Sequence, residues 1–442
     1  MKNISKPVFI VLAIAFAFRI CWMLLVYFKN PDGIWAFDSY GYWYLGKNLS
    51  EHGVFSQHMN PPFYPDYFRT PLYPLFLALF QILNADNFIL ILVQVILSVL
   101  TCYFTFRISK EILQNERAGL IAALIMALDV PSIVLSDFVL TETLFSFLFI
   151  ISCFLFLRFM KEKKLSSLVF SGIIFGLCML CRPIVAFLPL LFLFFIAFIH
   201  RKEIVKAIQH SAIFGMALLL VISPWVLRNK NVFGEFSLTY LGTHTLLNHH
   251  AASIEAEVRG KSYSSFISEY RQEVINKFQG DLTEKRRDAL KQPAEFAAFI
   301  RNESFRTIRE NFEIFLKIQI KNVFEFFVKP VRGYIDLQLK NLPAYSGKNI
   351  SLLAKIIVVI QLLFLALIYI GFIWGIFSMK KEFIFLIFIL LLIIYFSNMT
   401  VPPFSEARYR IPVMPLIAIV SAIGIDSTRK AIGKHLPLSQ QK

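Results

Sequence analysis

The stretch "GIWAFDSYGYWYLGKNLSEHGVF", residues 33–55, follows the first hydrophobic run of the chain and places the carboxylate of Asp38 inside an aromatic belt. The belt consists of Trp35, Phe37, Tyr40, Tyr42, Trp43 and Tyr44. Aromatic rings of this kind favour the boundary between membrane and water. An acid at that depth is costly unless it is paired or functional. The stretch therefore predicts a membrane protein with a paired or working acid at one membrane face.

The composition excludes an ordinary soluble globular protein. Of the 442 residues 57% are hydrophobic, and runs such as 352–378 are longer than the roughly 20 residues that cross a bilayer. The net charge of +16 would suit a nucleic-acid partner, but the basic residues cluster beside the hydrophobic runs, as retained cytoplasmic loops do. We therefore predict no nucleic-acid partner. The five cysteines lie in or beside the hydrophobic runs, which indicates packing residues rather than a disulfide framework.

The spacing of the hydrophobic runs predicts an all-α polytopic membrane protein with about ten transmembrane helices. The runs fall at 8–28, 88–108, 118–135, 143–159, 166–182, 184–200, 207–227, 352–378, 383–398 and 410–425. The stretch 69–84 has an apolar part of about a dozen residues, too short to span, and predicts a helix lying in the membrane plane.

The basic loops set the predicted topology. With the N-terminus in the cytoplasm, the basic segments 110–117, 161–164, 200–206, 380–381 and the C-terminal tail all share the cytoplasmic side. The external face then receives the loop 29–87, short turns at 136–142, 182–183 and 399–409, and the long segment 228–350. We predict three units: a transmembrane module at 1–227, an external helical region at 228–350, and C-terminal transmembrane helices with a cytoplasmic tail at 351–442. The part 294–328 predicts an amphipathic helix on the membrane surface.

Acids and arginines from distant segments meet at the predicted external face. They are Asp38, Asp137 and Glu142 with Arg69, Arg182, Arg228, Arg408 and Arg410. A guanidinium group suits phosphate oxygens, and a carboxylate takes a proton from an attacking hydroxyl. The aromatic belt and the in-plane helix suit a substrate that is partly lipid. Together these features predict a reaction on a phosphate-linked lipid.

Six short motifs in this order are similar to a known family. They are "FDSYGYWYLGKNLSEHG" (37–53), "FRTPLYPLFLALF" (68–80), Thr141–Glu142, Arg182–Pro183, "PWVLRN" (224–229) and "RYRIPVMP" (408–415). The chain resembles C-type glycosyltransferases, membrane enzymes that use polyprenyl-phosphate sugars. Nearest in pattern are the bacterial protein O-mannosyltransferase-like members and the lipid A aminoarabinose transferases. The likeness covers about 8–235 and 395–425. The WWDYG-type motif of oligosaccharyltransferases is missing from the sequence, which argues against that branch.

The resemblance implies roles for these residues. Asp38 would be the catalytic base, and Arg69 and Arg182 would bind the donor phosphate. The further substrate-binding candidates are Arg228, Arg408, Arg410 and Tyr40. Glu142 would orient the acceptor, hold an arginine or bind a divalent metal ion, and Asp137 competes for this second acidic role. A purely structural alternative makes Asp38 the N-cap of the helix that follows it.

The resemblance also implies partners and location. The donor would be a polyprenyl-phosphate sugar and the acceptor a glycan, lipid or protein, with inversion at the anomeric carbon. The protein would be integral to the plasma membrane (the inner membrane of a bacterium), with its site on the external or periplasmic face. No cofactor is required beyond the alternative of a divalent ion; for His244, His249 and His250 a solvated loop is favoured over a metal site. The alternative functions are a lipid-linked glycan polymerase or ligase, and a polyprenyl-lipid transporter. For Arg19, inside the first run, we predict pairing within the bundle.

Overall fold

The computed structural model describes residues 6–280, 293–339, 352–400 and 405–435, and within these ranges the chain forms helices and no strand. Parts of two predicted loops, 228–350 and 399–409, and the end of the tail lie outside the described residues. Six of the described helices are long and apolar enough to cross a membrane, and shorter apolar helices accompany them. The prediction of an all-α polytopic membrane protein is confirmed.

Helices follow all ten predicted hydrophobic runs. They are α1 (Lys6–Lys29), α4 (Asn87–Arg107), α5 (Glu116–Leu128) with α6 (Val130–Leu135), α7 (Glu142–Glu162), α8 (Leu165–Cys181), α9 (Leu188–Ile199), α10 (Ile204–Phe233), α17 (Leu352–Ser378), α18 (Phe383–Asn398) and α19 (Met414–His435). The run 118–135 differs from the prediction because it is two helices. Asp129 ends α5 and caps α6, accepting a hydrogen bond from the backbone N of Ser132 at 3.0 Å, and Pro131 lies in the first turn of the new helix.

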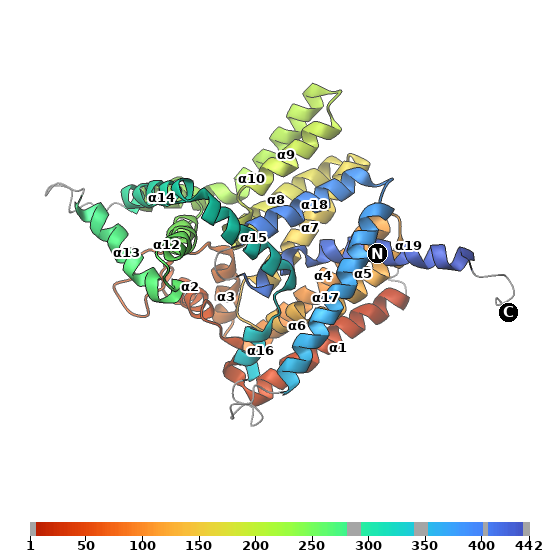
Figure 1. Ribbon diagram of the computed structural model, residues 1–442, viewed down its shortest axis with the longest axis horizontal. Coiled ribbons are helices and arrows are strands. Elements are labelled where there is room, and N and C mark those ends of the chain that lie inside the picture. Colours follow the sequence, from red (N-terminus) through yellow and green to blue (C-terminus); the bar gives the residue numbers. More distant parts are fainter. Residues whose placement is uncertain (1–5, 281–292, 340–351, 401–404, 436–442) are drawn as a thin grey trace.

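The other α-helices, with the π-helix η4 among them, gather at one side of the molecule, and the long apolar helices extend away from them (Figure 1). They are α2 (Ser39–His52), α3 (Leu72–Ile82), α11 (Leu241–Thr245), the π-helix η4 (Leu246–Ala251), α12 (Ala252–Val258), α13 (Tyr263–Gly280), α14 (Pro293–Glu310), α15 (Phe312–Val328) and α16 (Arg332–Leu339). The helix α3, predicted in the membrane plane, is 11 residues long. It packs on α2 at Gly46, where a Cβ atom would lie 3.0 Å from Leu77.

The prediction of one amphipathic helix over 294–328 is wrong, because Asn311 separates α14 from α15. Asn311 has a non-helical φ of −123°, and its side chain bonds the carbonyl of Thr307 at 3.1 Å. The two helices also differ in the direction of their apolar side chains. In α14, Phe296 and Phe299 pack inward against a local core. The exposed apolar stripe begins only at Phe305 and continues with Phe312, Leu316, Ile320 and Phe324.

Loops meet at two ends of the bundle. At the first, which we call the Asp38 end, the backbone N of Val139 donates to the carbonyl of Ile34 at 3.0 Å, and Thr70 Oγ1 donates to the carbonyl of Cys181 at 3.0 Å. At the opposite end, Lys161 Nζ donates to the carbonyl of Glu111 at 2.6 Å. The basic segments 110–117 and 161–164 thus lie at one end, away from Asp38.

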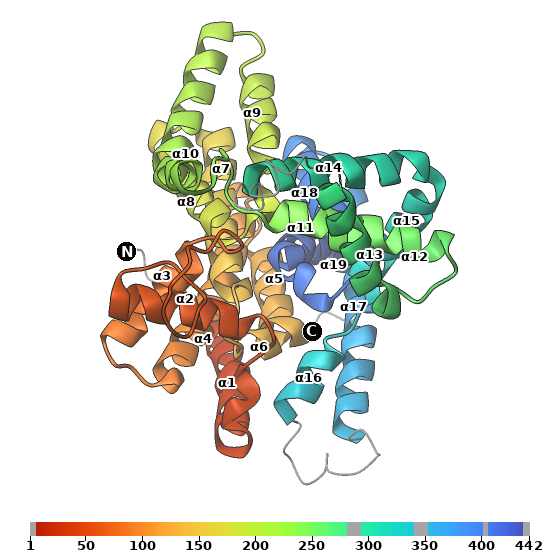
Figure 2. The same ribbon diagram turned by 90° about the vertical axis from the view of Figure 1, so that its left-hand side faces the viewer.

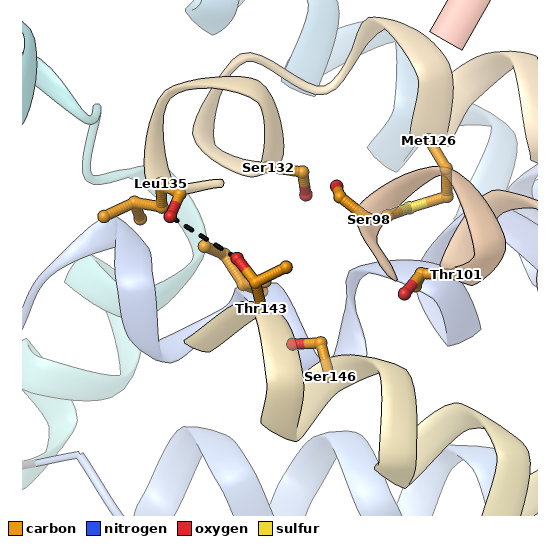
Figure 3. Close-up of a pocket in the computed structure, with 8 residues that line it drawn as sticks. Ser98, Thr101, Met126, Ser132, Leu135, Thr143 and Ser146 are labelled. Atoms are coloured by element: carbon orange, nitrogen blue, oxygen red, sulfur yellow. Dashed lines mark hydrogen bonds between the residues drawn. The ribbon is translucent and has the colours of Figure 1, made fainter. Parts of the chain in front are cut away.

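Arg19 is fully buried within the bundle and hydrogen-bonded, as predicted. Its Nε donates to Ser98 Oγ at 2.7 Å, and its terminal nitrogens donate to the carbonyls of Ala15, Met126 and Ala127 at 3.0–3.2 Å. Beside it lies a small cavity, shown in Figure 3, whose polar lining consists of hydroxyl groups: Ser98, Thr101, Ser132, Thr143 and Ser146. None of the predicted site residues lines this cavity.

Candidate active site

The turn before α2 directs Asp38 toward other segments rather than toward its own helix. Ser39 Oγ accepts a hydrogen bond from the backbone N of Ala36 at 2.9 Å, and the Asp38 side chain makes no capping bond. Instead, Asp38 Oδ1 accepts from Arg69 Nη2 at 2.8 Å and Oδ2 accepts from Arg408 Nη1 at 3.0 Å. The interpretation of Asp38 as only an N-cap is therefore wrong.

Arg69 is held by a turn that Asp66 builds. The Asp66 carboxylate accepts from the backbone nitrogens of Phe68 at 3.0 Å and Arg69 at 2.8 Å, and Gln57 donates to it at 2.5 Å. Burial raises the pKa of Asp66, and these hydrogen bonds oppose the rise. The Arg69 guanidinium lies 4.5 Å from the centre of the Tyr42 ring and donates to the Tyr42 hydroxyl at 3.1 Å. These contacts fix the direction of the guanidinium toward Asp38.

Glu142 and Arg182 form a second pair at the same end. Glu142 begins α7 and its side chain is 2% exposed; Arg182 directly follows α8. Arg182 Nη1 lies 2.6 Å from Glu142 Oε1 and 3.3 Å from Thr141 Oγ1. Two helix ends far apart in sequence thus bring a carboxylate and a guanidinium group together, as predicted from their positions beside the spans.

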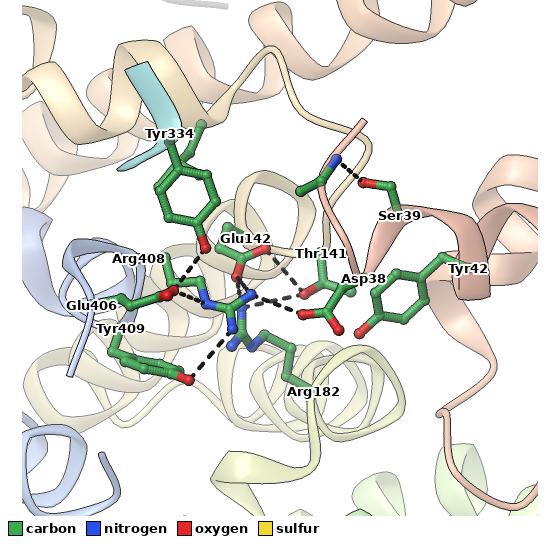
Figure 4. Close-up of polar contacts among 12 residues, drawn as sticks. Asp38, Ser39, Tyr42, Thr141, Glu142, Arg182, Tyr334, Glu406, Arg408 and Tyr409 are labelled. Carbon is green, nitrogen blue, oxygen red and sulfur yellow. Dashed lines mark hydrogen bonds and ion pairs between the residues drawn. The ribbon is translucent and has the colours of Figure 1, made fainter. Parts of the chain in front are cut away.

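Arg408 joins the two pairs (Figure 4). Besides its contact with Asp38, it lies 3.9 Å from Glu142 Oε1, and its Nε lies 2.8 Å from Glu406 Oε2. Glu406 in turn accepts a hydrogen bond from the Tyr334 hydroxyl at 2.7 Å. We call this set the arginine–carboxylate cluster: Asp38, Arg69, Glu142, Arg182, Glu406 and Arg408.

Two residues of this site, Glu406 and Tyr334, were not predicted from the sequence. Glu406 stands beside the arginines in "EARYRIP", which is a usable signal. Tyr334 lies in α16, within the region 228–350 that has no motif, and nothing in its sequence marks it.

Arg410 does not belong to the cluster, contrary to its prediction as a substrate ligand. It is 1% exposed and points into the fold. Its Nη1 donates to the carbonyls of Phe326 at 2.6 Å and Phe327 at 2.9 Å, and its Nη2 to that of Lys329 at 3.3 Å. These bonds tie the end of α15 to the start of α19, so the side chain is occupied by backbone oxygens.

Arg228 and Tyr40 also make no contact with a cluster carboxylate in the described residues. Arg228 Nη1 donates to the carbonyl of Asp66 at 2.8 Å and so supports the turn that holds Arg69. The Tyr40 ring stacks on Trp35 at 5.5 Å and is half exposed. Their roles as substrate ligands stay predictions.

The two candidates for the second acid, Glu142 and Asp137, lie in different surroundings. Glu142 contacts Arg182 and approaches Arg408, whereas Asp137 is fully buried and its Oδ1 lies 3.4 Å from Ser136 Oγ. Its Oδ2 has no hydrogen-bond partner, and burial raises the pKa of Asp137 well above its usual value. Asp137 therefore stays outside the cluster.

Charge within the cluster is balanced, with three carboxylates against three guanidinium groups. Burial alone would raise the pKa of Asp38, but the charges and hydrogen bonds of Arg69 and Arg408 outweigh burial and lower it to about 2. Asp38 is thus ionised near neutral pH, and an incoming anion meets guanidinium groups that already have carboxylate partners.

The alternative of a divalent ion is not supported by the ligand set. Asp38 and Glu142, the acids that would bind it, each pair with an arginine. Within the described part of the chain, no group of three or more His, Cys, Asp or Glu side chains is arranged to hold a metal. Burial lowers the pKa of His244 and of His250 to about 4, so both imidazoles are neutral near pH 7, the form that can bind a metal, but neither belongs to such a ligand group among the described residues.

Comparisons with known proteins bear on the family and the fold of the chain. Residues 68–227 match the family model described as dolichyl-phosphate-mannose-protein mannosyltransferase. No protein with a curated description matches the chain. The fold is similar to the oligosaccharyltransferase AglB of Archaeoglobus fulgidus solved with an inhibitory peptide and a dolichol-phosphate, with a TM-score of 0.54 and 14% identity over 99% of this chain.

A structure of the A. fulgidus oligosaccharyltransferase in its apo form has a TM-score of 0.53 and 15% identity over 98% of this chain. This chain spans about half the length of both, covering 52% and 53% of them. At this identity the likeness concerns the fold. Family match and fold together confirm the predicted resemblance to polyprenyl-phosphate-dependent C-type glycosyltransferases.

Proposed function

We propose that this chain, which resembles C-type glycosyltransferases in its fold and in the family match over 68–227, moves a sugar from a polyprenyl-phosphate donor to an acceptor hydroxyl or amine. One observation carries the proposal: Asp38 lies between Arg69 and Arg408, beside the Arg182–Glu142 pair. A base next to several guanidinium groups suits attack on a sugar whose leaving group is a phosphate.

The arginines would bind the donor phosphate. Guanidinium groups match phosphate oxygens with two parallel hydrogen bonds, and they stabilise the charge that grows as the sugar–phosphate bond breaks. Arg69 and Arg182 are the principal candidates, and Arg408 lies between them. Because polyprenyl phosphate leaves as a stable anion, no general acid is needed for its departure.

Asp38 would accept the proton of the acceptor. The acceptor oxygen or nitrogen then forms a bond to the anomeric carbon while the carbon–oxygen bond to phosphate breaks on the opposite face, which inverts the configuration. A carboxylate with a pKa of about 2 is a weak base. When the phosphate takes hydrogen bonds from Arg69 and Arg408, Asp38 loses part of this stabilisation and becomes more basic. Donor binding would in this way prepare the base.

The test is direct. Purified protein in lipid nanodiscs is incubated with polyprenyl-phosphate sugars that differ only in the sugar, and free polyprenyl phosphate is measured. We expect release from at least one donor by the natural chain and little from Asp38→Asn. Correctly folded protein that releases no lipid phosphate from any donor, with glycan, lipid and peptide acceptors present, would refute the proposal.

We place the reaction on the external face of the plasma membrane because the basic segments 110–117 and 161–164 lie at the end away from Asp38. An impermeant thiol reagent should label cysteines introduced in 56–66 on intact cells and not those in 161–164. A cysteine-free background is needed, since the natural chain has five free cysteines. Labelling of 161–164 from outside would reverse the orientation.

A further inference from the structure

The helix α16 reaches the arginine–carboxylate cluster through a chain of three contacts. The Tyr334 hydroxyl donates to Glu406 at 2.7 Å, Glu406 lies 2.8 Å from Arg408 Nε, and Arg408 Nη1 lies 3.0 Å from Asp38. We infer that Tyr334 and Glu406 are positioning residues that hold Arg408 against Asp38. This inference rests on the proposed function, and it makes part of the region 228–350 necessary for the reaction.

The anchor of α16 is rigid. Gln338 is fully buried; its side chain accepts from Trp22 Nε1 at 2.8 Å and donates to the carbonyl of Val134 at 3.3 Å. Asn30 Nδ2 donates to the Gln338 carbonyl at 2.7 Å. At Gly33 a Cβ atom would lie 3.0 Å from that same carbonyl, so a larger residue would force this tight approach apart. Figure 2 shows α16 between α1 and α17. The helix is thus fixed to the end of α1.

This anchor places the Tyr334 ring in one position. The ring meets Phe138 edge to face, with centroids 5.3 Å apart. Burial raises the pKa of Tyr334 above its usual value, so the phenol keeps its proton and donates it to Glu406. The hydrogen bond fixes one carboxylate oxygen of Glu406, the oxygen that faces Arg408.

Arg408 needs such a guide because three acids compete for it. Asp38 lies at 3.0 Å, Glu406 at 2.8 Å and Glu142 at 3.9 Å. A guanidinium on a flexible side chain turns toward the carboxylates that are available. Without the fixed oxygen of Glu406, Arg408 is free to move toward Glu142 and away from Asp38. Tyr334 and Glu406 therefore determine which carboxylate Arg408 contacts.

Turnover of the donor found in the release assay tests this inference. Tyr334→Phe keeps the ring and its contact with Phe138 and removes one hydroxyl. We expect kcat to fall about tenfold, as for the loss of a hydrogen bond to a charged group, with an unchanged thermal midpoint. Tyr369→Phe is the matched control, because its hydroxyl bonds the carbonyl of Phe327 outside the cluster; its turnover should stay at the natural level.

A double-mutant cycle separates positioning from a local structural effect. Since Tyr334 acts through Glu406, the Tyr334→Phe change should cost nothing further in a Glu406→Ala background. An equal loss in both backgrounds, or an equal loss in Tyr369→Phe, overturns the inference.

A second readout does not depend on turnover. With 3-fluorotyrosine at 334, the 19F resonance should move on Glu406→Gln and on Arg408→Lys, and stay in place on Lys161→Gln at the opposite end. If these shifts appear while the natural chain turns over no donor, the proposed function fails and the positioning contact stands. If the resonance moves on neither Glu406→Gln nor Arg408→Lys, the contact between Tyr334 and Glu406 is refuted.

Discussion

Arg408 and Arg410 stand two residues apart in "RYRIP", yet they occupy opposite kinds of environment. Arg408 contacts the carboxylates of Asp38 and Glu406 in a partly exposed cluster, and its side chain is 19% exposed. Arg410 is buried and bonds three backbone carbonyls. Arg19 repeats the second pattern.

The difference distinguishes working from structural arginines in a membrane bundle. A guanidinium bound to backbone carbonyls cannot exchange partners without breaking the helix ends that it joins. One that is bound to carboxylates can turn to another anion, because its partners are mobile side chains. Only the second kind suits a phosphate that arrives and leaves.

The largest expected effect concerns the acid that Arg408 contacts. Asp38→Asn keeps the shape of the side chain and removes the proton acceptor, so glycosyl transfer should fall by about two to four orders of magnitude, the usual value of general-base catalysis. Donor binding, measured with radiolabelled polyprenyl-phosphate sugar, should persist. Near-normal transfer by this variant would move the catalytic role to Glu142.

The next effect should appear in stability rather than in turnover. Arg410→Ala removes buried hydrogen bonds to the carbonyls of Phe326 and Lys329, which should lower the free energy of unfolding by about 2–4 kcal/mol. Protein that remains folded should keep its turnover. Arg408→Ala should do the reverse, with the larger change in turnover. Unfolding in detergent and lipid-phosphate release are measured on both variants. The same pattern in both would mean that Arg408 and Arg410 do not differ in role.

The phosphate ligands come third. Arg69→Ala and Arg182→Ala should each reduce turnover roughly ten- to a hundredfold, the equivalent of about 1.5–3 kcal/mol for one charge-assisted contact. The lysine variants should keep more activity than the alanine variants because they retain the charge. Steady-state rates across donor concentrations test this, with Arg158→Ala, exposed on α7 and paired with Glu162, as the control. Alanine variants at the natural rate would remove both arginines from the site.

Hydropathy was sufficient for most of the fold because a bilayer requires long apolar helices whatever their neighbours. The break at Asp129 was missed since a buried cap inside an apolar run leaves the mean hydropathy high. Within the site, Asp38 and Arg69 were found because they lie in the external loop that follows the first predicted span. Glu142 and Arg182 were found because each stands at the external end of a predicted span.

The rest of the site could not be predicted from the sequence. The tyrosine of α16 reaches the cluster only through the tertiary anchor at Gln338, which no local pattern records. Arg408 and Arg410 were not distinguishable either. A 3₁₀ turn over Ala407–Tyr409 followed by another at Ile411–Val413 sends their side chains apart, and the sequence "RYRIP" does not specify that geometry.

The smallest effect is the pH dependence of stability. The Asp38 pKa falls from 3.8 to about 2 on folding. A lowered pKa contributes stability above the unfolded value, and this contribution disappears as pH falls through the folded value. The natural chain should therefore lose about 2 kcal/mol more than Asp38→Asn between about pH 5 and pH 2. Unfolding midpoints of both proteins in an acid-stable detergent test this. Because Arg69 and Arg408 stay charged over this range, parallel curves for the two proteins would mean that neither arginine stabilises the Asp38 carboxylate in the folded protein. The contrast with the carbonyl-bound Arg410 would then lose its electrostatic basis.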